Sequence, residues 1–233
     1  MKKTKFKYNF IGIFIILSFH LNAQTSKMER NYNKIPFKDS ITKDVKEQFK
    51  KINNSKKEIL LIAKKLNDSL FSIFLYNNTK DSLNIELQNR SLFLIQEAKN
   101  KNGEWEPIEY QSLAACANSY HYYKIKSKEI IRTDSKSYKG DFQTKIRFKL
   151  NHNDKIFYSN SLPSGINENQ FVIPKNLTKD RLYGQYLDYG GKKLLKKVIF
   201  IEKNYNKEIG IQYQKWKKEI ERKRAEYYKN KKK

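Results

Sequence analysis

The sequence predicts an all-β fold: an antiparallel β-sandwich or barrel with a basic amphipathic helix at its C-terminal end. Short runs of alternating apolar and polar residues follow one another through the middle of the chain, which is typical of strands with one buried face. Turn-forming Asn, Asp and Gly residues separate the runs, and no helical pattern lies between them. We therefore expect a signal peptide over 1–23, a polar linker over 24–56, the sandwich over 57–174, and a basic, largely helical extension over 175–233.

The first residues predict a secretory signal peptide. Four early lysines precede an apolar run from Phe10 to Phe19, and a small residue, Ala23, then stands before the polar Gln24. A membrane-spanning helix needs about 20 apolar residues, so this shorter run favours cleavage after Ala23 over an uncleaved anchor. We expect an exported protein, periplasmic or extracellular, with no transmembrane segment after cleavage.

The predicted linker, residues 24–56, is polar and rich in lysine. Within it, Ile41, Val45, Phe49 and Ile52 recur at helical spacing, which predicts one short amphipathic helix.

The predicted strands follow in order. They cover residues 58–66, 69–77, 82–88, two runs within 92–110, 119–126, 129–133, 142–150 and 155–160. The Asn67–Asp68 pair predicts the first turn. Asn102–Gly103, between the two runs of 92–110, predicts a type I′ hairpin turn, because both residue types accept a positive φ.

The strand over 142–150 has two chemically different faces. Phe142, Thr144 and the alternate residues up to Leu150 form one face, and Gln143, Lys145, Arg147 and Lys149 form the other. We interpret the cationic row as the solvent-exposed outer face of the sandwich, because such a face keeps a sheet soluble.

The formal net charge of +25 raises the question of a nucleic-acid partner. Only seven of the 49 basic residues are arginine, the residue that best matches phosphates and base edges. Lysine, asparagine, isoleucine and tyrosine dominate instead, and A/T-rich codons encode all four. Together with export, this composition argues against nucleic-acid binding.

No catalytic or metal-binding motif stands out, and no cofactor is expected. The lone Cys116 is expected to be a buried small apolar residue, with pairing between chains or a reactive thiol beside His121 as alternatives. His121 and His152 are far apart in sequence and make a weak metal site. Glu104, Glu106 and Glu109 are expected to face solvent.

Near the C-terminus, Ile209, Tyr213, Trp216, Ile220 and Tyr227 form a helical stripe among cations. The stripe can pack on the sandwich, or the helix can lie on an anionic surface. The residues expected to contact such a surface are Lys215, Trp216, Lys217, Lys218, Arg222, Lys223 and Arg224.

Part of the chain resembles a group of uncharacterised exported proteins of the flavobacterial lineage. The resemblance covers Trp105 to Phe171 and is carried by W-x-P-I-E-Y, C-x-N-S-Y, K-G-x-F-x-T-K-I-R-F, Y-S-N and I-N-x-x-Q-F. "LYNNTKDSLNIEL", with the later glycine-containing entry into a long strand, is similar to the immunoglobulin-like domain of bacterial intracellular proteinase inhibitors. This resemblance implies that the fold is an immunoglobulin-like antiparallel β-sandwich. The leader departs from that intracellular role.

Three Asp-Ser-aliphatic tripeptides resemble the O-glycosylation acceptor pattern of exported proteins in the same phylum. Their serines are Ser40, Ser69 and Ser82. Asp-Ser is also ordinary turn chemistry.

These observations favour a non-catalytic binding or scaffolding module of the bacterial envelope. Its partner would be an envelope protein, a polysaccharide or an anionic lipid surface. The alternatives are a small periplasmic hydrolase with an unrecognised site, or a proteinase-inhibitor-like domain.

Overall fold

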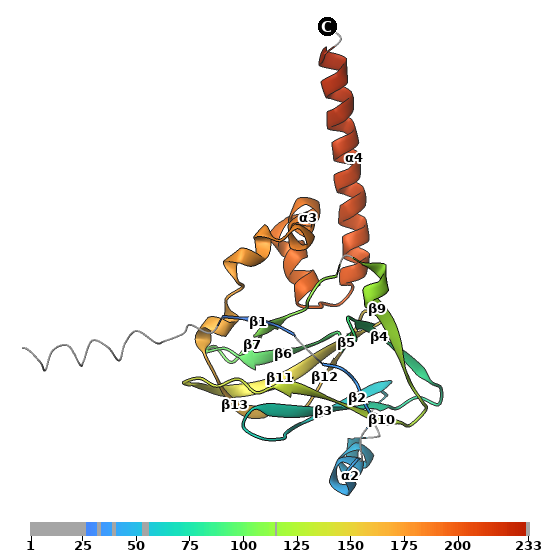
Figure 1. Cartoon of the computed structure of the whole chain (residues 1–233), viewed down its shortest axis with the longest axis vertical. Coiled ribbons are helices and arrows are strands. Elements are labelled where there is room, and N and C mark those ends of the chain that lie inside the picture. The colour runs from blue at the N-terminus through green and yellow to red at the C-terminus, as the bar shows by residue number, and fades with distance from the viewer. Residues whose placement is uncertain (1–26, 32–33, 39–40, 53–55, 115, 232–233) are drawn as a thin grey trace, which may run out of the picture.

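The computed structural model describes residues 27–31, 34–38, 41–52, 56–114 and 116–231. The predicted signal peptide, 1–23, lies outside these residues. The fold is 34% helical and 36% strand, with several small sheets and a curled half-barrel (Figure 1). The prediction of an all-β sandwich is therefore wrong, although the predicted C-terminal helix is present.

Most strands lie close to where alternation predicts them, whereas β1 and β13 lie where no strand is predicted. They are β1 Glu29–Arg30, β2 Ile59–Lys65, β3 Leu70–Asn77, β4 Leu83–Gln88, β5 Ser91–Leu92, β6 Leu94–Lys99, β7 Trp105–Pro107, β8 Glu109–Tyr110, β9 Tyr120–Ile125, β10 Ile130–Lys136, β11 Phe142–His152, β12 Lys155–Tyr158 and β13 Leu162–Ile166. They pair in the orders β10-β3-β2, β12-β11-β6-β7 and β5-β4-β9, while β13 pairs with β11 and β1 pairs with β8.

The helices are α2 Lys43–Ile52, α3 Arg181–Ile199 and α4 Tyr205–Lys231, with short 3-10 turns η1 Ala117–Ser119, η2 Glu168–Phe171 and η3 Lys175–Lys179. The helix predicted between Ile41 and Ile52 is confirmed as α2. Within α3, Gly191 adopts a φ of +66°, a left-handed conformation that interrupts the helix. The break divides α3 into two helical segments, both within the predicted helical extension.

Helix α2 is one reason why the sandwich prediction fails. On β2, Ile59 and Leu61 face the main core, while Leu60 and Ile62 on the opposite face pack with Phe49 of α2. A strand covered on both faces reads as a continuous apolar run, and ILLIA is such a run. The sequence therefore carried a signal that the outer face of β2 is covered.

Helix α3 covers strand β6 in the same way. Phe93 and Ile95 pack with Leu194 and Val198 of α3, whereas Leu94 enters the main core. Helices thus occupy outer faces that a sandwich would leave in water.

The two predicted turns are confirmed in position, since β2 pairs with β3 and β6 pairs with β7 as antiparallel hairpins, but the type of the second turn differs from prediction. In the loop between β6 and β7, Gly103 has a φ of +79° but Asn102 has no positive φ, so the predicted type I′ turn is wrong. The N–H of Gly103 donates to the Asn100 carbonyl at 2.9 Å. Asn153 and Asp154, between β11 and β12, have φ values of +50° and +58°, as a type I′ turn requires.

Residues 27–31 and 34–38, which we name the N-terminal strap, lie against the strands rather than in a free linker. Strand β1 pairs with β8 in parallel. Phe37 and Arg132 exchange backbone hydrogen bonds of 2.8 and 2.9 Å. Met28 and Lys34 are buried. The strap can be polar in sequence and still be buried, because its buried polar side chains bond to polar partners.

No helix within the described residues is both long enough and apolar enough to cross a membrane.

Candidate functional site

A groove of about 560 Å³ lies between α2 and the segment that contains β12, with β2 at its floor. The last turns of α2, residues 59–62 of β2 and residues 157–160 line it. Ligand pockets in proteins occupy about 300–1,000 Å³, so the groove is large enough for a ligand or a short peptide.

The backbone edge of β2 borders this groove. β2 pairs with β3 in antiparallel register, and the Asn78 N–H donates to the Glu58 carbonyl at 2.8 Å. The even-numbered residues of β2 therefore bond to β3, while Ile59 and Leu61 direct their N–H and C=O groups to the other side. No described residue bonds to these groups of Ile59 and Leu61. An unpaired edge is a template for an added strand, but Ile59 and Leu61 are 2% and 5% exposed and β12 lies beside them, so an added strand has to displace the segment that contains β12.

Asn160 shows how such an edge is satisfied. The N–H of Ala63, the next outward-facing residue after Leu61, donates to Asn160 Oδ1 at 2.8 Å. Asn160 Nδ2 donates to the Ala63 carbonyl at 3.0 Å. One side-chain amide thus replaces a neighbouring strand at Ala63. At the other end of β2, the Lys155 ammonium pairs with the Glu58 carboxylate at 3.1 Å. β12 therefore lies beside β2, but no ladder of backbone hydrogen bonds joins these two strands in the described residues.

The rim of the groove combines apolar and cationic side chains. Ile52, at the end of α2, is 41% exposed, and Tyr158 is also exposed. Lys51 and Lys57 lie at the same end of the groove. The rim therefore favours a ligand with apolar groups and negative charge.

The cationic row of β11 does not form an exposed binding face. Lys145 is exposed, as predicted. Arg147 is half-buried: it pairs with Glu97 at 2.7 Å, and its guanidinium lies 3.8 Å from the centre of the Tyr158 ring. Lys149 is 2% exposed and contacts Glu97 and Glu202. The prediction of a solvated row is wrong at two positions, because β6 and the turn after α3 supply carboxylates to this face.

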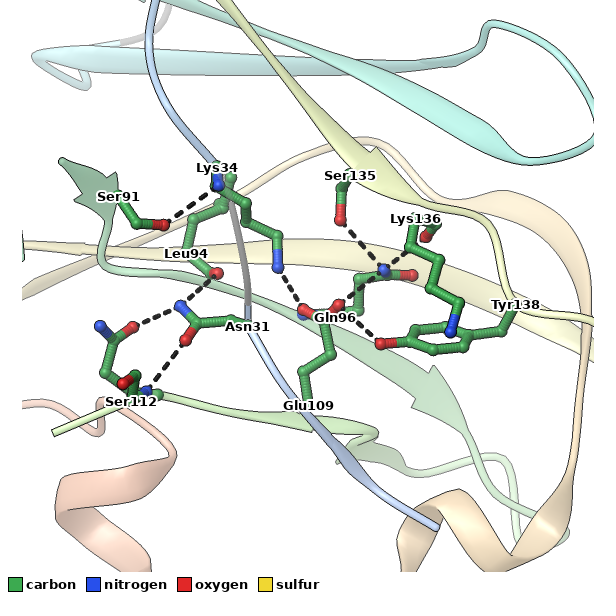
Figure 2. A network of polar contacts seen from close by, with 11 residues as sticks. Asn31, Lys34, Ser91, Leu94, Gln96, Glu109, Ser112, Ser135, Lys136 and Tyr138 are labelled. Atoms are coloured by element: carbon green, nitrogen blue, oxygen red, sulfur yellow. Dashed lines mark hydrogen bonds and ion pairs between the residues drawn. The ribbon is translucent and has the colours of Figure 1, made fainter. Parts of the chain in front are cut away.

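Figure 2 shows a buried polar network that the sequence did not reveal. Lys34 of the strap forms an ion pair with Glu109, and both side chains are buried. Glu109 also accepts hydrogen bonds from Gln96 and from the Tyr138 hydroxyl, the latter at 3.0 Å. Burial lowers the pKa of Lys34, against the opposing effect of Glu109. Burial, reinforced by Glu109, raises the pKa of Tyr138.

Glu109 corrects the expectation that the glutamates after the hairpin face solvent. Glu104 is exposed and Glu106 half-buried, but Glu109 is 2% exposed. The network holds the strap to the sheet. Its charges are paired inside the protein, and we assign it a structural role.

The cysteine and the histidines are not brought together. Cys116 is exposed, so the expectation of a buried residue is wrong. His121 is exposed on β9, while His152 is buried at the end of β11. No contact joins Cys116 to His121 in the described part of the chain. Within that part, no three His, Cys, Asp or Glu side chains are arranged to hold a metal ion.

The predicted surface-contact residues all lie on α4. Trp216 is half-buried and packs on Tyr189 of α3 at a ring distance of 5.1 Å, so the first half of α4 docks on the body. Residues 221–231 are exposed throughout, and the helix projects away from the strands (Figure 1). Arg222 is engaged by Glu219 and Glu226 of the same helix.

Two of the three predicted acceptor serines are described. Ser69 and Ser82 are exposed, at the starts of β3 and β4. Ser40 lies outside the described residues.

No protein-family model matches the sequence, and no curated protein is similar enough to count as a relative.

Proposed function

We propose that the protein is an exported, non-catalytic binding module of the bacterial envelope that holds an extended peptide segment of a partner protein in the groove between α2 and β12. The observation that carries this proposal is the unpaired edge of β2. Ile59 and Leu61 offer two N–H donors and two C=O acceptors beside an apolar groove. Strand addition uses main-chain hydrogen bonds for affinity and flanking pockets for specificity.

The groove also defines the partner's side chains. Successive side chains of an added strand point to opposite faces, so alternate residues would meet the apolar floor formed by Leu60 and Ile62. Lys51 and Lys57 favour an acidic residue at that end of the peptide. The occupant is thus an extended, alternately apolar peptide with an acidic end.

The test uses a fluorescein-labelled hexapeptide with valine at alternate positions, serine between them and aspartate at one end. Fluorescence anisotropy should show saturable binding to the whole protein. Ile52→Glu, which places a carboxylate on the exposed rim, should weaken binding at least tenfold. Leu66→Glu is the matched control, because Leu66 is 48% exposed but lies outside the groove.

A second peptide separates strand addition from simple apolar contact. N-methylation of alternate residues removes the N–H donors that pair with β2, and this peptide should not bind. Equal binding of both peptides, or equal losses from the two protein variants, would exclude strand addition. Recovery of a shortened peptide after incubation would favour the alternative of a hydrolase.

Export belongs to the same proposal. The intact mass of protein isolated from the native envelope should correspond to a chain that begins at Gln24. A folded protein that retains Met1 would contradict the signal peptide.

A second candidate contact is the outer half of α4. Residues 221–231 are exposed and project from the body, and basic residues outnumber acidic ones there. This favours contact with an anionic lipid surface. Modification of Ser69 or Ser82 stays a proposal that their exposure supports.

A further inference from the structure

A second cavity, of about 100 Å³, lies where β4 and β9 meet α3 and the start of α4. It is remote from the groove, since α2 and α4 extend from opposite sides of the sheets (Figure 1). Its walls include Glu86 and Gln88 of β4, Tyr120 of β9, Tyr186 of α3 and Tyr205 of α4.

A chain of amides fixes which atom of the Gln88 side chain is left without a partner. Asn31 Oδ1 accepts from the Ser112 N–H at 3.0 Å, so Asn31 Nδ2 is the donor to the Leu94 carbonyl and to Gln111 Oε1 (the first two contacts are drawn in Figure 2). Gln111 Nε2 must then donate to Gln88 Oε1, at 3.4 Å. This order leaves Gln88 Nε2 as the terminal donor.

Gln88 Nε2 is buried and has no hydrogen-bond partner among the described residues. The Gln88 side chain is 2% exposed and lines the cavity. Buried amide donors are normally paired, because leaving one unpaired costs about 1–3 kcal/mol. The wall of the cavity therefore holds an unpaired donor, and because Nε2 itself has almost no accessible surface, a ligand's oxygen atom reaches it only when the side chains around Gln88 shift.

Glu86 supplies the opposite chemistry. Its carboxyl is half-buried and, within the described part of the chain, forms no ion pair or hydrogen bond. Lysine and arginine are abundant in this chain, so a half-buried carboxylate without a cation is unusual here. Burial without a compensating cation raises the pKa of Glu86.

Aromatic rings complete the walls. Tyr120 and Tyr205 lie close enough to Glu86 for its charge to raise the pKa of both hydroxyls, although burial is the larger cause in each case. Tyr186 and Phe93 also line the cavity. Aromatic faces attract cations, and most strongly where water is excluded.

We propose that this cavity binds a small organic cation: a primary ammonium group that pairs with Glu86, joined by a short linker to a hydroxyl or carbonyl oxygen that accepts from Gln88 Nε2. The tyrosine rings surround the ammonium group. The volume admits a molecule of only a few heavy atoms, or the terminal ammonium and first carbonyl of a longer molecule. An anionic ligand is excluded, because Glu86 would repel it.

Three probes separate the two groups. 2-Aminoethanol carries both the ammonium group and the oxygen, ethylammonium carries the cation alone, and ethylene glycol carries oxygen without the cation. Binding to the whole protein is followed by isothermal titration and by shifts of the tyrosine ring signals in NMR spectra. The affinity should fall in the order 2-aminoethanol, ethylammonium, ethylene glycol. Glu86→Gln should reduce the affinity for 2-aminoethanol at least tenfold.

Glu221→Gln is the matched control, because Glu221 is an exposed glutamate on α4 outside the cavity, and it should leave the affinity unchanged. Thermal unfolding of each variant confirms that the fold is intact. Gln88→Met, which removes the amide donor without adding an acceptor or a charge, should remove the preference for 2-aminoethanol over ethylammonium. Equal binding of ethylene glycol, binding unaffected by Glu86→Gln, or no binding of any probe would overturn the proposal.

Discussion

At the scale of single residues, the main finding is that alternation does not distinguish a solvated row of cations from a paired one. Arg147 and Lys149 occupy the positions that an outer face predicts. They are nevertheless covered, because Glu97 lies opposite Arg147 on β6 and Glu202 reaches Lys149 from the turn after α3. Both partners are about 50 residues away in sequence.

Lys149→Ala should therefore destabilise the fold substantially. The substitution leaves Glu97 buried without one of its cations, and lost hydrogen bonds to charged groups amount to about 1.5–3 kcal/mol. Phe148→Ala, on the apolar face, should cost about 3–5 kcal/mol. Lys145→Ala is the control at an exposed position of the same row and should change stability by less than about 0.5 kcal/mol. Urea denaturation measures all three. If Lys149→Ala behaves like Lys145→Ala, the buried contacts of Lys149 contribute nothing.

His152 makes stability depend on pH. Burial lowers its pKa below the ordinary value of 6.5, with a smaller opposing effect of Glu58. Above pH 6.5 the imidazole is neutral in both states and has no effect. Below it, the unfolded chain takes up a proton that the folded protein does not, so the free energy of unfolding falls as the pH drops. This loss continues until the pH reaches the folded-state pKa.

His152→Gln should remove most of this dependence between pH 7.5 and 5.5, as measured by urea denaturation at each pH. His121→Gln is the control, because His121 is exposed, and it should keep the wild-type dependence. An identical dependence in wild type and His152→Gln would show that His152 is not the responsible group.

At the scale of elements, the sequence predicted most strands and two helices, because these depend on local patterns. Alternation located β4, β9 and β11, and the spacing of Val45 and Phe49 located α2. Helix α3 lies within the predicted helical extension, but its bounds were not predicted, because Gly190 and Gly191 interrupt it. The groove escaped prediction because it depends on where β12 lies relative to β2, which no local pattern determines. The apolar run over residues 59–63 was the available signal, since it implies cover on both faces.

The two halves of α4 have different surroundings, which allows a sharp test of its charge. A chain that ends at Lys218 keeps the packing of Tyr205, Ile209 and Trp216 but lacks the projecting half. Its thermal unfolding should match that of the full chain. Its cosedimentation with phosphatidylserine vesicles at low salt should be largely lost, since each basic residue near an anionic surface contributes about 1 kcal/mol.

The control for this truncation is the triple substitution of the exposed Lys80, Lys124 and Lys126 by glutamine, which lowers the net charge without touching α4. This variant should still bind the vesicles. Equal losses from the truncation and the triple variant would indicate a general effect of net charge. If the full chain does not bind the vesicles, the charged side chains on the outer half of α4 are only solvated and do not contact a membrane.

At the scale of the whole molecule, the fold class was wrong because the sheets are assembled by segments far apart in sequence. Lys34 and Glu109 are 75 residues apart, and neither predicts the other. The strap looks like a linker because its sequence is polar, yet Met28, Asn31 and Lys34 are among its buried residues. Composition separates polar from apolar segments, but it does not show which polar segments find buried partners.

The last prediction tests whether the strap belongs to the cooperative fold. A chain that begins at Thr42 lacks the cation that pairs with Glu109 and the amide that bonds to the Leu94 carbonyl and Gln111. Removing one partner of a buried ion pair costs about 3–5 kcal/mol, so this chain should unfold at a much lower urea concentration. A chain that begins at Lys27 keeps the strap and should match one that begins at Gln24. Lys34→Met in the full chain should produce a large part of the loss alone, because Glu109 then stays buried without its cation. If the chain from Thr42 unfolds at the same urea concentration as the chain from Lys27, the strap lies on the fold without stabilising it, and the buried pair has no net effect on stability.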